Sequence, residues 1–332
     1  MSLLTSFRYL VALHQHQHFG RAAAACHITQ PALSNAIRAM EEEFGTAIVK
    51  RGRSFESFTP EGERIFITAQ RVIHEQELLQ QDLKSTADRP VGCLTLGAVP
   101  SVMPIAARFV GMLQGRHPGL SLVLRSMSSP DIEAGLENLS LDMALGYTER
   151  LQSRGTKIAS LDQYTERYYL LRRATKPVKI GLRMVGKPMT WRAASQLPMC
   201  LLTTEMHNRT IIDLAFQKSG VKIQPVIETN SILALGLTVL VGEVNSILPS
   251  ALVGVLRGYA ELEAVPLNAP EVFTPIGFLF AQSDRPSRAL RAATELAQSA
   301  QWLEHLAAHT GVLETTAPSD PALITAAQSQ SV

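Results

Sequence analysis

FGRAAAACHITQPALSNAIR, residues 19–38, predicts two short helices joined by a tight turn. The alanine run from Ala22 to Ala25 favours helix and has almost no side-chain bulk, so a second helix can cross it at close range. Residues 26–28 form the turn, and Thr29 is a favoured N-cap for the helix that follows. The segment therefore predicts a helix-turn-helix unit near the start of the chain.

The second of these helices has two chemically different faces. Its apolar residues recur at intervals of three and four and share one face, namely Leu33, Ile37, Met40 and Phe44. The opposite face begins with polar groups, and amides can pair with adenine while arginine binds guanine or phosphate. Such a helix is suited to the major groove of double-stranded DNA. The candidate DNA-binding residues on it are Gln30, Pro31, Ser34, Asn35 and Arg38.

This segment resembles the LysR-type transcriptional regulators, because many residue types agree with that family at fixed spacing. The family pattern is an Ala-Ala pair, Gln-Pro-Ala-x-Ser, Ile-x-x-Leu-Glu, a glycine, an arginine and Thr-x-x-Gly. The counterparts in this chain are Ala23-Ala24, residues 30–34, residues 37–41, Gly45, Arg51 and residues 59–62.

The resemblance implies a fold as well as a function. It implies an N-terminal all-α winged helix-turn-helix with a long linker helix, followed by a C-terminal α/β effector domain. That domain has two lobes and is similar to periplasmic solute-binding proteins. Family members usually bind a small carboxylate or a related metabolite between the lobes, and this effector controls how they sit on DNA.

Outside this segment, composition narrows the class of protein without identifying it. The chain has 332 residues, 46% hydrophobic and 18% charged, with a formal net charge of +2. These values fit a globular protein of two or three domains, and so small a net charge does not itself indicate nucleic acid. No secretory signal and no run of about 18 apolar residues occurs, so we expect a cytoplasmic protein without a membrane span.

The three cysteines, Cys26, Cys93 and Cys200, are widely spaced and odd in number. Reduced, buried thiols are typical of cytoplasmic proteins. The alternative is a redox sensor, but a peroxide-sensing member of the family would need two cysteines in one sensing half-domain. Only Cys200 follows Cys93, so the sequence favours simple thiols, and it predicts neither a cofactor nor a metal site.

Residues 47–58 are short, basic and partly alternating, and they predict a two-stranded wing. Arg51 and Arg53 would lie at its turn, where arginine can enter a minor groove or contact phosphates. A solvated loop is the alternative. Thr59 and Pro60 then favour the start of a long helix of about 25 residues.

This long helix carries an apolar seam with a three-four alternation, which is typical of a coiled coil. We expect it to pair with a second chain and give a homodimer or homotetramer; packing on its own domain is the alternative. A dimer places two reading helices about one DNA turn apart, or a multiple of it, which implies an inverted-repeat operator. The seam residues are Ile65, Ala69, Val72, Gln76, Leu79 and Leu83.

From residue 91 the pattern alternates between strand and helix, which predicts a parallel sheet covered on both faces. One last helix is predicted from Pro286 to His309. The expected domains are residues 1–58 (winged helix-turn-helix), 59–90 (linker helix and hinge) and 91–310 (effector domain), with a disordered tail at 311–332. Within the effector domain we expect lobe I at about 91–162 and 270–310 and lobe II at about 163–269.

Hydroxyl side chains follow several predicted strands, where ligands of α/β sheets sit against helix N-termini. Simple helix capping is the alternative for each of them. His207 and Arg209 could add positive charge for an anion, although an exposed salt bridge is expected for Arg209. The candidate effector-binding residues are Ser101, Ser128, Ser129, Thr203 and Thr204.

Two other functional classes are alternatives to a regulator. A solute-binding transport protein would explain residues 91–310 but not the first ninety. An α/β enzyme with an accessory helical domain would need a glycine-rich phosphate loop, a metal-ligand cluster or a nucleophile elbow, and the sequence shows none of these. We therefore expect a non-enzymatic DNA-binding regulator whose conformational equilibrium is shifted by an effector.

Overall fold

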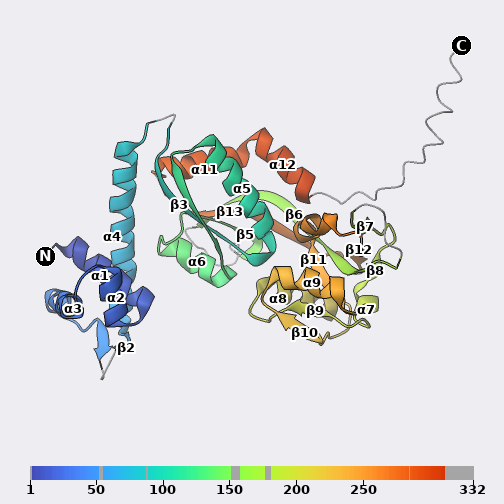
Figure 1. The fold of residues 1–332 in the computed structure, drawn as a ribbon, viewed down its shortest axis with the longest axis horizontal. Helices are drawn as coiled ribbons and strands as arrows, with labels where there is room; N and C mark the ends of the chain where they lie inside the picture. Colours follow the sequence, from blue (N-terminus) through green and yellow to red (C-terminus); the bar gives the residue numbers. More distant parts are fainter. Residues whose placement is uncertain are drawn as a thin grey trace, which may run out of the picture.

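The computed structural model describes residues 2–51, 55–86, 89–150, 158–175, 181–283 and 285–310. A small helical domain and a larger α/β region are connected by the long helix α4 (Pro60–Lys84) (Figure 1). The tail at 311–332 and Arg53 lie outside the described residues. Within the described ranges, none of the helices combines the length and apolar character needed to cross a bilayer.

The first helices are α1 (Leu3–His16), α2 (Phe19–Ala25) and α3 (Gln30–Phe44), as the helix-turn-helix pattern predicts. Thr29 caps α3, accepting a hydrogen bond from the Ala32 amide at 3.4 Å. The apolar face of α3 is buried except at its end. Phe44 is 42% exposed because it is the last residue of α3, and its ring stacks on Phe7 at 6.4 Å.

The predicted wing is present as β1 (Val49–Arg51) paired antiparallel with β2 (Phe55–Phe58). Glu41 of α3 holds it, because its Oε1 accepts the amides of Ile48 at 2.9 Å and Val49 at 3.2 Å. The start of α4 crosses the base of the wing so closely that a Cβ on Gly62 would lie 2.0 Å from the Ile48 carbonyl oxygen. The Thr-x-x-Gly motif therefore sets the junction between wing and α4.

The predicted seam along α4 is divided between two environments. Ala69 is fully buried in the core of its own helical domain, and Gln76 accepts a hydrogen bond from Arg8 at 2.9 Å. The prediction that Ala69 faces a second chain is therefore wrong, because α1 already covers it. The exposed apolar residues of the seam are Val72 (43%), Leu79 (60%) and Leu83 (77%), and we call these three the open stripe.

The α/β region is built on a nine-stranded sheet in the order β4-β3-β5-β13-β6-β12-β7, with β11 on β6 and β8 on β12. Its strands are β3 (Gly92–Ala98), β4 (Leu120–Ser126), β5 (Met143–Tyr147), β6 (Ile158–Arg173), β7 (Arg183–Met184), β8 (Met189–Thr190), β11 (Ser246–Pro249), β12 (Leu262–Asn268) and β13 (Phe273–Ala281). The predicted all-parallel sheet is wrong. β3 is parallel to β4 and β5, whereas β13 is antiparallel to β5 and β6. The chain leaves lobe I along β6 and returns along β13, which forces opposite directions on the two strands.

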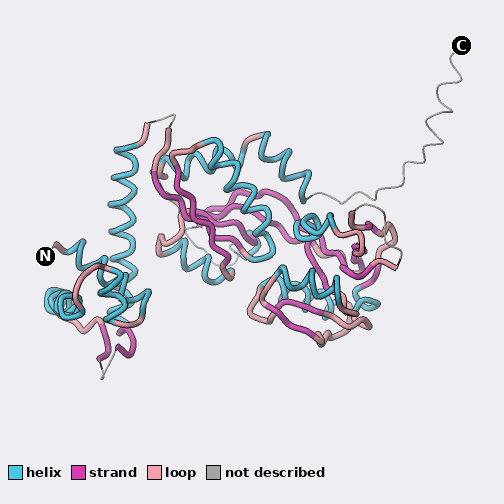
Figure 2. Tube along the Cα trace, viewed as in Figure 1, coloured by secondary structure: helices cyan, strands magenta, loops and turns pink. Residues whose placement is uncertain are grey.

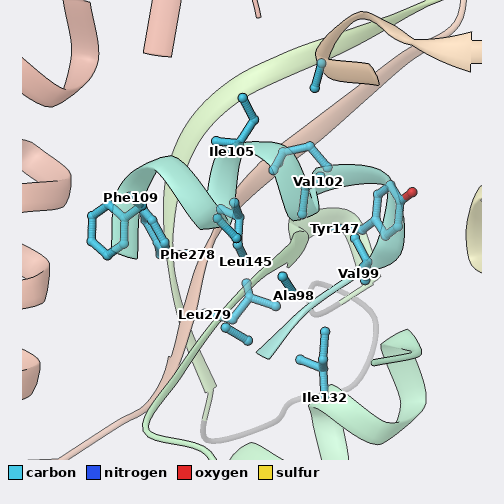
Figure 3. Packing of buried hydrophobic residues seen from close by; sticks show 14 of the residues in the cluster. Ala98, Val99, Val102, Ile105, Phe109, Ile132, Leu145, Tyr147, Phe278 and Leu279 are labelled. Atoms are coloured by element: carbon cyan, nitrogen blue, oxygen red, sulfur yellow. The ribbon is translucent and has the colours of Figure 1, made fainter. Parts of the chain in front are cut away.

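Helices cover both faces of the lobe I part of this sheet. α5 (Met103–Arg116), α11 (Arg288–Gln298) and α12 (Ala300–Thr310) lie on one side and α6 (Ser129–Glu137) on the other (Figures 1 and 2). Phe109 of α5 packs on Phe278 of β13 with ring centroids 4.4 Å apart, as seen at the left of Figure 3. The predicted single last helix is wrong, because Ser299 is extended and its hydroxyl caps α12 at the Trp302 amide.

Lobe II surrounds the far half of β6 and has a small parallel sheet of its own, β9 (Cys200–Leu202) with β10 (Ile227–Thr229). Its helices are α7 (Trp191–Ala194), α8 (His207–Lys218), α9 (Ile232–Val241) and α10 (Ser250–Val255). Arg209 of α8 is 6% exposed and bonded to Asp213, Glu228 and the Leu202 carbonyl, so the expected exposed salt bridge is wrong. Its guanidinium instead ties α8 to the small sheet.

Candidate functional site

The start of α3 presents the predicted DNA-binding residues on one outer face. Gln30, Pro31, Asn35 and Arg38 are exposed, and Ser34 is half-buried. The helix repeat puts these side chains opposite the buried Leu33, Ile37 and Met40. Lys50 of the wing is exposed, whereas the Arg51 side chain and all of Arg53 lie outside the described residues.

A second cluster of polar groups lies where the lobes meet. Tyr147 ends β5, and its hydroxyl is 2.8 Å from the Ser101 hydroxyl, both side chains being buried. Figure 3 shows the Tyr147 hydroxyl pointing away from the apolar core of lobe I. The ring of His207, the first residue of α8 in lobe II, stands edge-on to it with centroids 4.7 Å apart. Burial raises the pKa of Tyr147 above its usual range, so its hydroxyl remains a hydrogen-bond donor.

Charged residues of lobe I surround His207. Arg150 donates from Nε to Glu133 Oε1 at 2.7 Å, and its Nη1 lies 3.3 Å from His207 Nδ1. His207 Nε2 faces Glu149 Oε1 at 3.5 Å without forming a hydrogen bond, although the Nε2 atom is buried. The cluster therefore bridges the lobes with one arginine, one histidine and two carboxylates.

The crossing strands β6 and β13 complete this cluster with a row of alternating polar residues. Tyr164 donates to Glu166 Oε1 at 3.0 Å, and the Tyr168 hydroxyl lies 3.3 Å from Thr274 Oγ1. Asn208 of lobe II donates to Tyr168 at 3.4 Å. Glu166 is fully buried, and this burial raises the pKa of its carboxyl to about 8, so near neutral pH most of it is an uncharged acid.

Several buried polar atoms around this cluster have no hydrogen-bond partner among the described residues, namely Ser129 Oγ, Glu166 Oε2 and His207 Nε2. Ser129 lies one helical turn before Glu133 on α6, on the side that binds Arg150. Unpartnered buried polar atoms are costly unless water or a ligand meets them. The interlobe cluster is therefore a site where a small polar molecule can be bound by both lobes.

Only part of the predicted effector set reaches this cluster. Ser101 and Ser129 are buried at it, whereas Ser128 caps α6 and bonds Asp131 at 2.6 Å. Thr203 donates to Glu205 at 2.6 Å, and Thr204 is exposed. Sequence reasoning missed the crossing-strand residues, although Tyr164-x-Glu166-x-Tyr168 has the two-residue period of a half-buried strand.

The thiols and the metal ligands of the described chain are dispersed. Cys26 is half-buried, Cys93 exposed and Cys200 buried, and all three are free. Burial raises the pKa of the Cys26 and Cys200 thiols, which lowers the fraction of reactive thiolate. In the described ranges, histidine, cysteine and carboxylate side chains do not come together in groups of three that could hold a metal ion.

Two family models match the chain and together cover most of it. "Bacterial regulatory helix-turn-helix protein, lysR family" matches residues 4–63. "LysR substrate binding domain" matches residues 87–302.

Curated relatives include regulators named for hydrogen peroxide. The hydrogen peroxide-inducible genes activator of Pectobacterium carotovorum subsp. carotovorum is 32% identical over 143 residues, which is 43% of this chain and 47% of that protein. The DNA-binding transcriptional dual regulator OxyR of Escherichia coli (strain K12) matches with the same identity and the same shares of both chains. The match thus spans about half the length of these relatives.

Solved structures share the fold over nearly the whole chain. A full-length OxyR variant from Pseudomonas aeruginosa superposes with a TM-score of 0.65 at 24% identity, covering 89% of this chain and 97% of that one. Full-length CbnR in complex with its target DNA gives 0.63 at 17% identity, covering 92% of this chain and 100% of that one. At these identities the likeness extends to the fold alone.

Proposed function

The chain belongs to the LysR family, and on that premise we propose that it is a transcriptional regulator that binds double-stranded DNA through α3. The observation that carries this proposal is the exposed polar face of α3, with Gln30, Asn35 and Arg38 on it. Amide and guanidinium groups on an exposed helix can read base edges, and the adjacent Lys50 can contact phosphate. Such a regulator would act in the cytoplasm, where the DNA is, and we assign it no catalytic role.

We propose that a small anionic metabolite, such as a carboxylate, is the effector and binds at the interlobe cluster. Arg150 offers positive charge from lobe I and His207 a ring nitrogen from lobe II, and Ser101 and Tyr147 offer hydroxyl groups beside them. A ligand bonded to both lobes favours the closed arrangement over the open one, because it binds the closed arrangement more tightly. Closure would then alter how the DNA-binding domains are presented.

The names of the relatives favour a second candidate, a response to peroxide through a thiol. The three cysteine thiols support a peroxide response less strongly than the interlobe cluster supports the binding of a small-molecule effector. Cys200 is buried in lobe II on β9, with its thiol pKa raised, whereas Cys93 is exposed on β3 of lobe I. A peroxide sensor needs a low-pKa, accessible thiol and usually a resolving partner.

We propose that the open stripe of α4 pairs two chains into a dimer, or into a dimer within a tetramer. Val72, Leu79 and Leu83 form this stripe, and Leu79 and Leu83 are among the most exposed apolar residues that the structure describes. An exposed apolar seam on a helix of 25 residues has the length and spacing for a coiled coil. A dimer of this kind would recognise an inverted repeat.

The test uses the full chain, the DNA upstream of its own gene and a panel of carboxylate metabolites. We expect gel retardation at low salt, and we expect at least one carboxylate to raise the melting temperature of the wild type but not of Arg150→Gln. Arg125→Gln, an exposed arginine of β4, is the matched control and should retain the shift. Absence of retardation would sink the DNA-binding proposal, and equal shifts in wild type and Arg150→Gln would sink the assigned effector site.

A further inference from the structure

A cavity lies at the hinge, beside the interlobe cluster. It measures about 600 Å³ and is bordered by the middle of β6, residues 184–191, the end of β12 and residues 271–273. Volumes of about 300–1,000 Å³ are usual for small-molecule sites, and folded proteins rarely leave such a space as a packing defect. None of the predicted effector residues lines this cavity.

The cavity and the interlobe cluster use alternate residues of the same strands. Tyr168 sends its hydroxyl to Thr274 in the interlobe cluster. Its neighbour Arg167 points the other way, because successive side chains of a strand alternate, and its guanidinium lies over the Phe273 ring at 5.1 Å. Pro266 pairs with Tyr169 across β12 and β6, so this opposite face continues onto β12. Tyr168 also lines the cavity, so the two sites are neighbours that share this residue, while Arg167 belongs to the cavity alone.

Three polar side chains at this cavity form no side-chain hydrogen bond or salt bridge with another described residue. Asn268 lines the cavity, and its Oδ1 atom is buried without a hydrogen bond. Arg167 and Glu271 also line it, are exposed, and form no salt bridge with another described residue. The remaining walls are apolar or aromatic and include Met184, Trp191 and Phe273.

We propose that this cavity is a second small-molecule site and that it binds an α-amino acid with an apolar side chain. Arg167 suits the carboxylate, since guanidinium and carboxylate form paired hydrogen bonds. Asn268 Oδ1 and the Glu271 carboxylate both accept hydrogen bonds, and together they suit the ammonium group. The aromatic and aliphatic walls suit the side chain. One cation, one anion and one neutral acceptor around an apolar space match a zwitterion better than a simple carboxylate.

Occupancy of this site acts on the hinge. The amino acid would bridge β6, through Arg167, to the end of β12 and to residues 271–273, which lead into β13. β6 and β13 also carry Tyr168 and Thr274 of the interlobe cluster, so a ligand that fixes their relative position changes the affinity of the cluster for its own ligand. The second site therefore goes beyond the proposed effector function and can exist without it.

The probe is L-phenylalanine, titrated calorimetrically into the full-length protein. We compare 3-phenylpropionate, which lacks the ammonium group, and phenethylamine, which lacks the carboxylate. We expect saturable binding of L-phenylalanine and affinity at least about tenfold weaker for each analogue, because each loses a charge-assisted hydrogen bond. L-leucine and L-tryptophan extend the test to other apolar side chains.

Variants locate the binding. Arg167→Gln and Asn268→Leu should each weaken L-phenylalanine by about tenfold, while Arg173→Gln, an exposed arginine farther along β6, should leave it unchanged. Arg167 is exposed, so its variant should fold even if Asn268→Leu does not, and unaltered melting temperatures confirm folding. The proposal is overturned if none of the three amino acids binds or if Arg167→Gln binds as wild type. The proposal is also overturned if His207→Ala loses L-phenylalanine binding while Arg167→Gln keeps it. That result would place the amino acid at the interlobe cluster.

Discussion

We propose that base recognition by α3 depends most directly on two of its side chains, Asn35 and Ser34. We expect Asn35→Ala and Ser34→Ala to weaken binding to the operator more than binding to random DNA, by about 1–3 kcal/mol for each lost base contact. The reason is that phosphate contacts act on every sequence alike, whereas base contacts do not. Competition gel shifts measure the difference, with Glu43→Ala at the far end of α3 as the control. Equal losses on both DNAs would exclude base reading by these residues.

Glu166 makes the stability of the protein depend on pH. Burial raises the pKa of its carboxyl to about 8 in the folded chain, against an ordinary value of 4.5 when unfolded. Between these values the folded state holds a proton that the unfolded state has lost, so the free energy of unfolding falls as pH rises. The slope from this one group is at most about 1.4 kcal/mol per pH unit, and it vanishes above the folded pKa.

Glu166→Gln should remove this slope, because glutamine copies the protonated acid and cannot ionise. Tyr164 can still donate to its Oε1. We expect denaturant unfolding to give a flatter stability profile from about pH 5 to about pH 8 and a variant more stable than wild type at the alkaline end. The two proteins should converge near the acid end of the window. Parallel profiles would show that the carboxyl is ionised in the folded state.

The limits of sequence reasoning are clearest at single residues. The exposure of the candidate DNA-binding residues on α3 was predictable, because a helix with one apolar face leaves its other face exposed. The effector candidates were not, because a hydroxyl after a strand has several uses. Ser128 caps a helix, Thr203 bonds a neighbouring carboxylate, and only Ser101 and Ser129 are buried near the other lobe. Arg150 and His207 meet across the lobes, and that pairing has no local signal in the sequence.

Elements with a local pattern were predictable, and elements shared between two cores were not. α9 (Ile232–Val241) has such a local pattern, because its apolar run ends at Gly242. β6 was missed because one strand of 16 residues serves both lobes, and its burial pattern changes along its length. The predicted last helix was too long because Ser299 divides it into two helices. This break lets Trp302 enter the core of lobe I.

The open stripe on α4 leads to a prediction about assembly. Leu79→Asp should dissociate the dimer, because a symmetric interface buries this leucine twice and an aspartate there loses the apolar burial and adds a buried charge. At about 1.5–3 kcal/mol for each leucine, the dissociation constant should rise by about a hundredfold or more. Sedimentation of the variant at micromolar concentration should then give half the wild-type mass.

Ile67 supplies the control for this variant. It is an exposed apolar residue of the same helix, at 41%, but the helix repeat places it away from the stripe. Ile67→Asp should therefore keep the wild-type mass. Equal dissociation by both variants would point to general damage to α4, and an unchanged mass for Leu79→Asp would show that the open stripe is not the contact.

At the scale of the whole molecule, α4 is attached at both ends. Its start crosses the wing, and its last turns meet lobe I, where Arg288 donates from its amide to Asp82 at 3.3 Å and from its guanidinium to the Ser85 carbonyl at 3.1 Å. His74 of α4 also lies 3.9 Å from Asp142 of lobe I. A movement of lobe I is therefore transmitted to the helix that carries the DNA-binding domain, which gives effector binding a physical route to the operator.

The dimer proposed on the open stripe fixes the two α3 helices relative to each other, and the DNA must match that spacing. Tight binding then needs two half-sites on one face of the duplex, separated by about one turn of 10–10.5 bp or a multiple of it. Inserting about half a turn, 5 bp, between the half-sites of a selected operator should rotate one of them to the far side and reduce affinity by at least about a hundredfold. Inserting a full turn should restore part of it, because the half-sites face the same side again. Quantitative footprinting on the three DNAs measures this, and affinity that ignores the spacing would mean that each chain binds DNA alone and that α4 does not set the register.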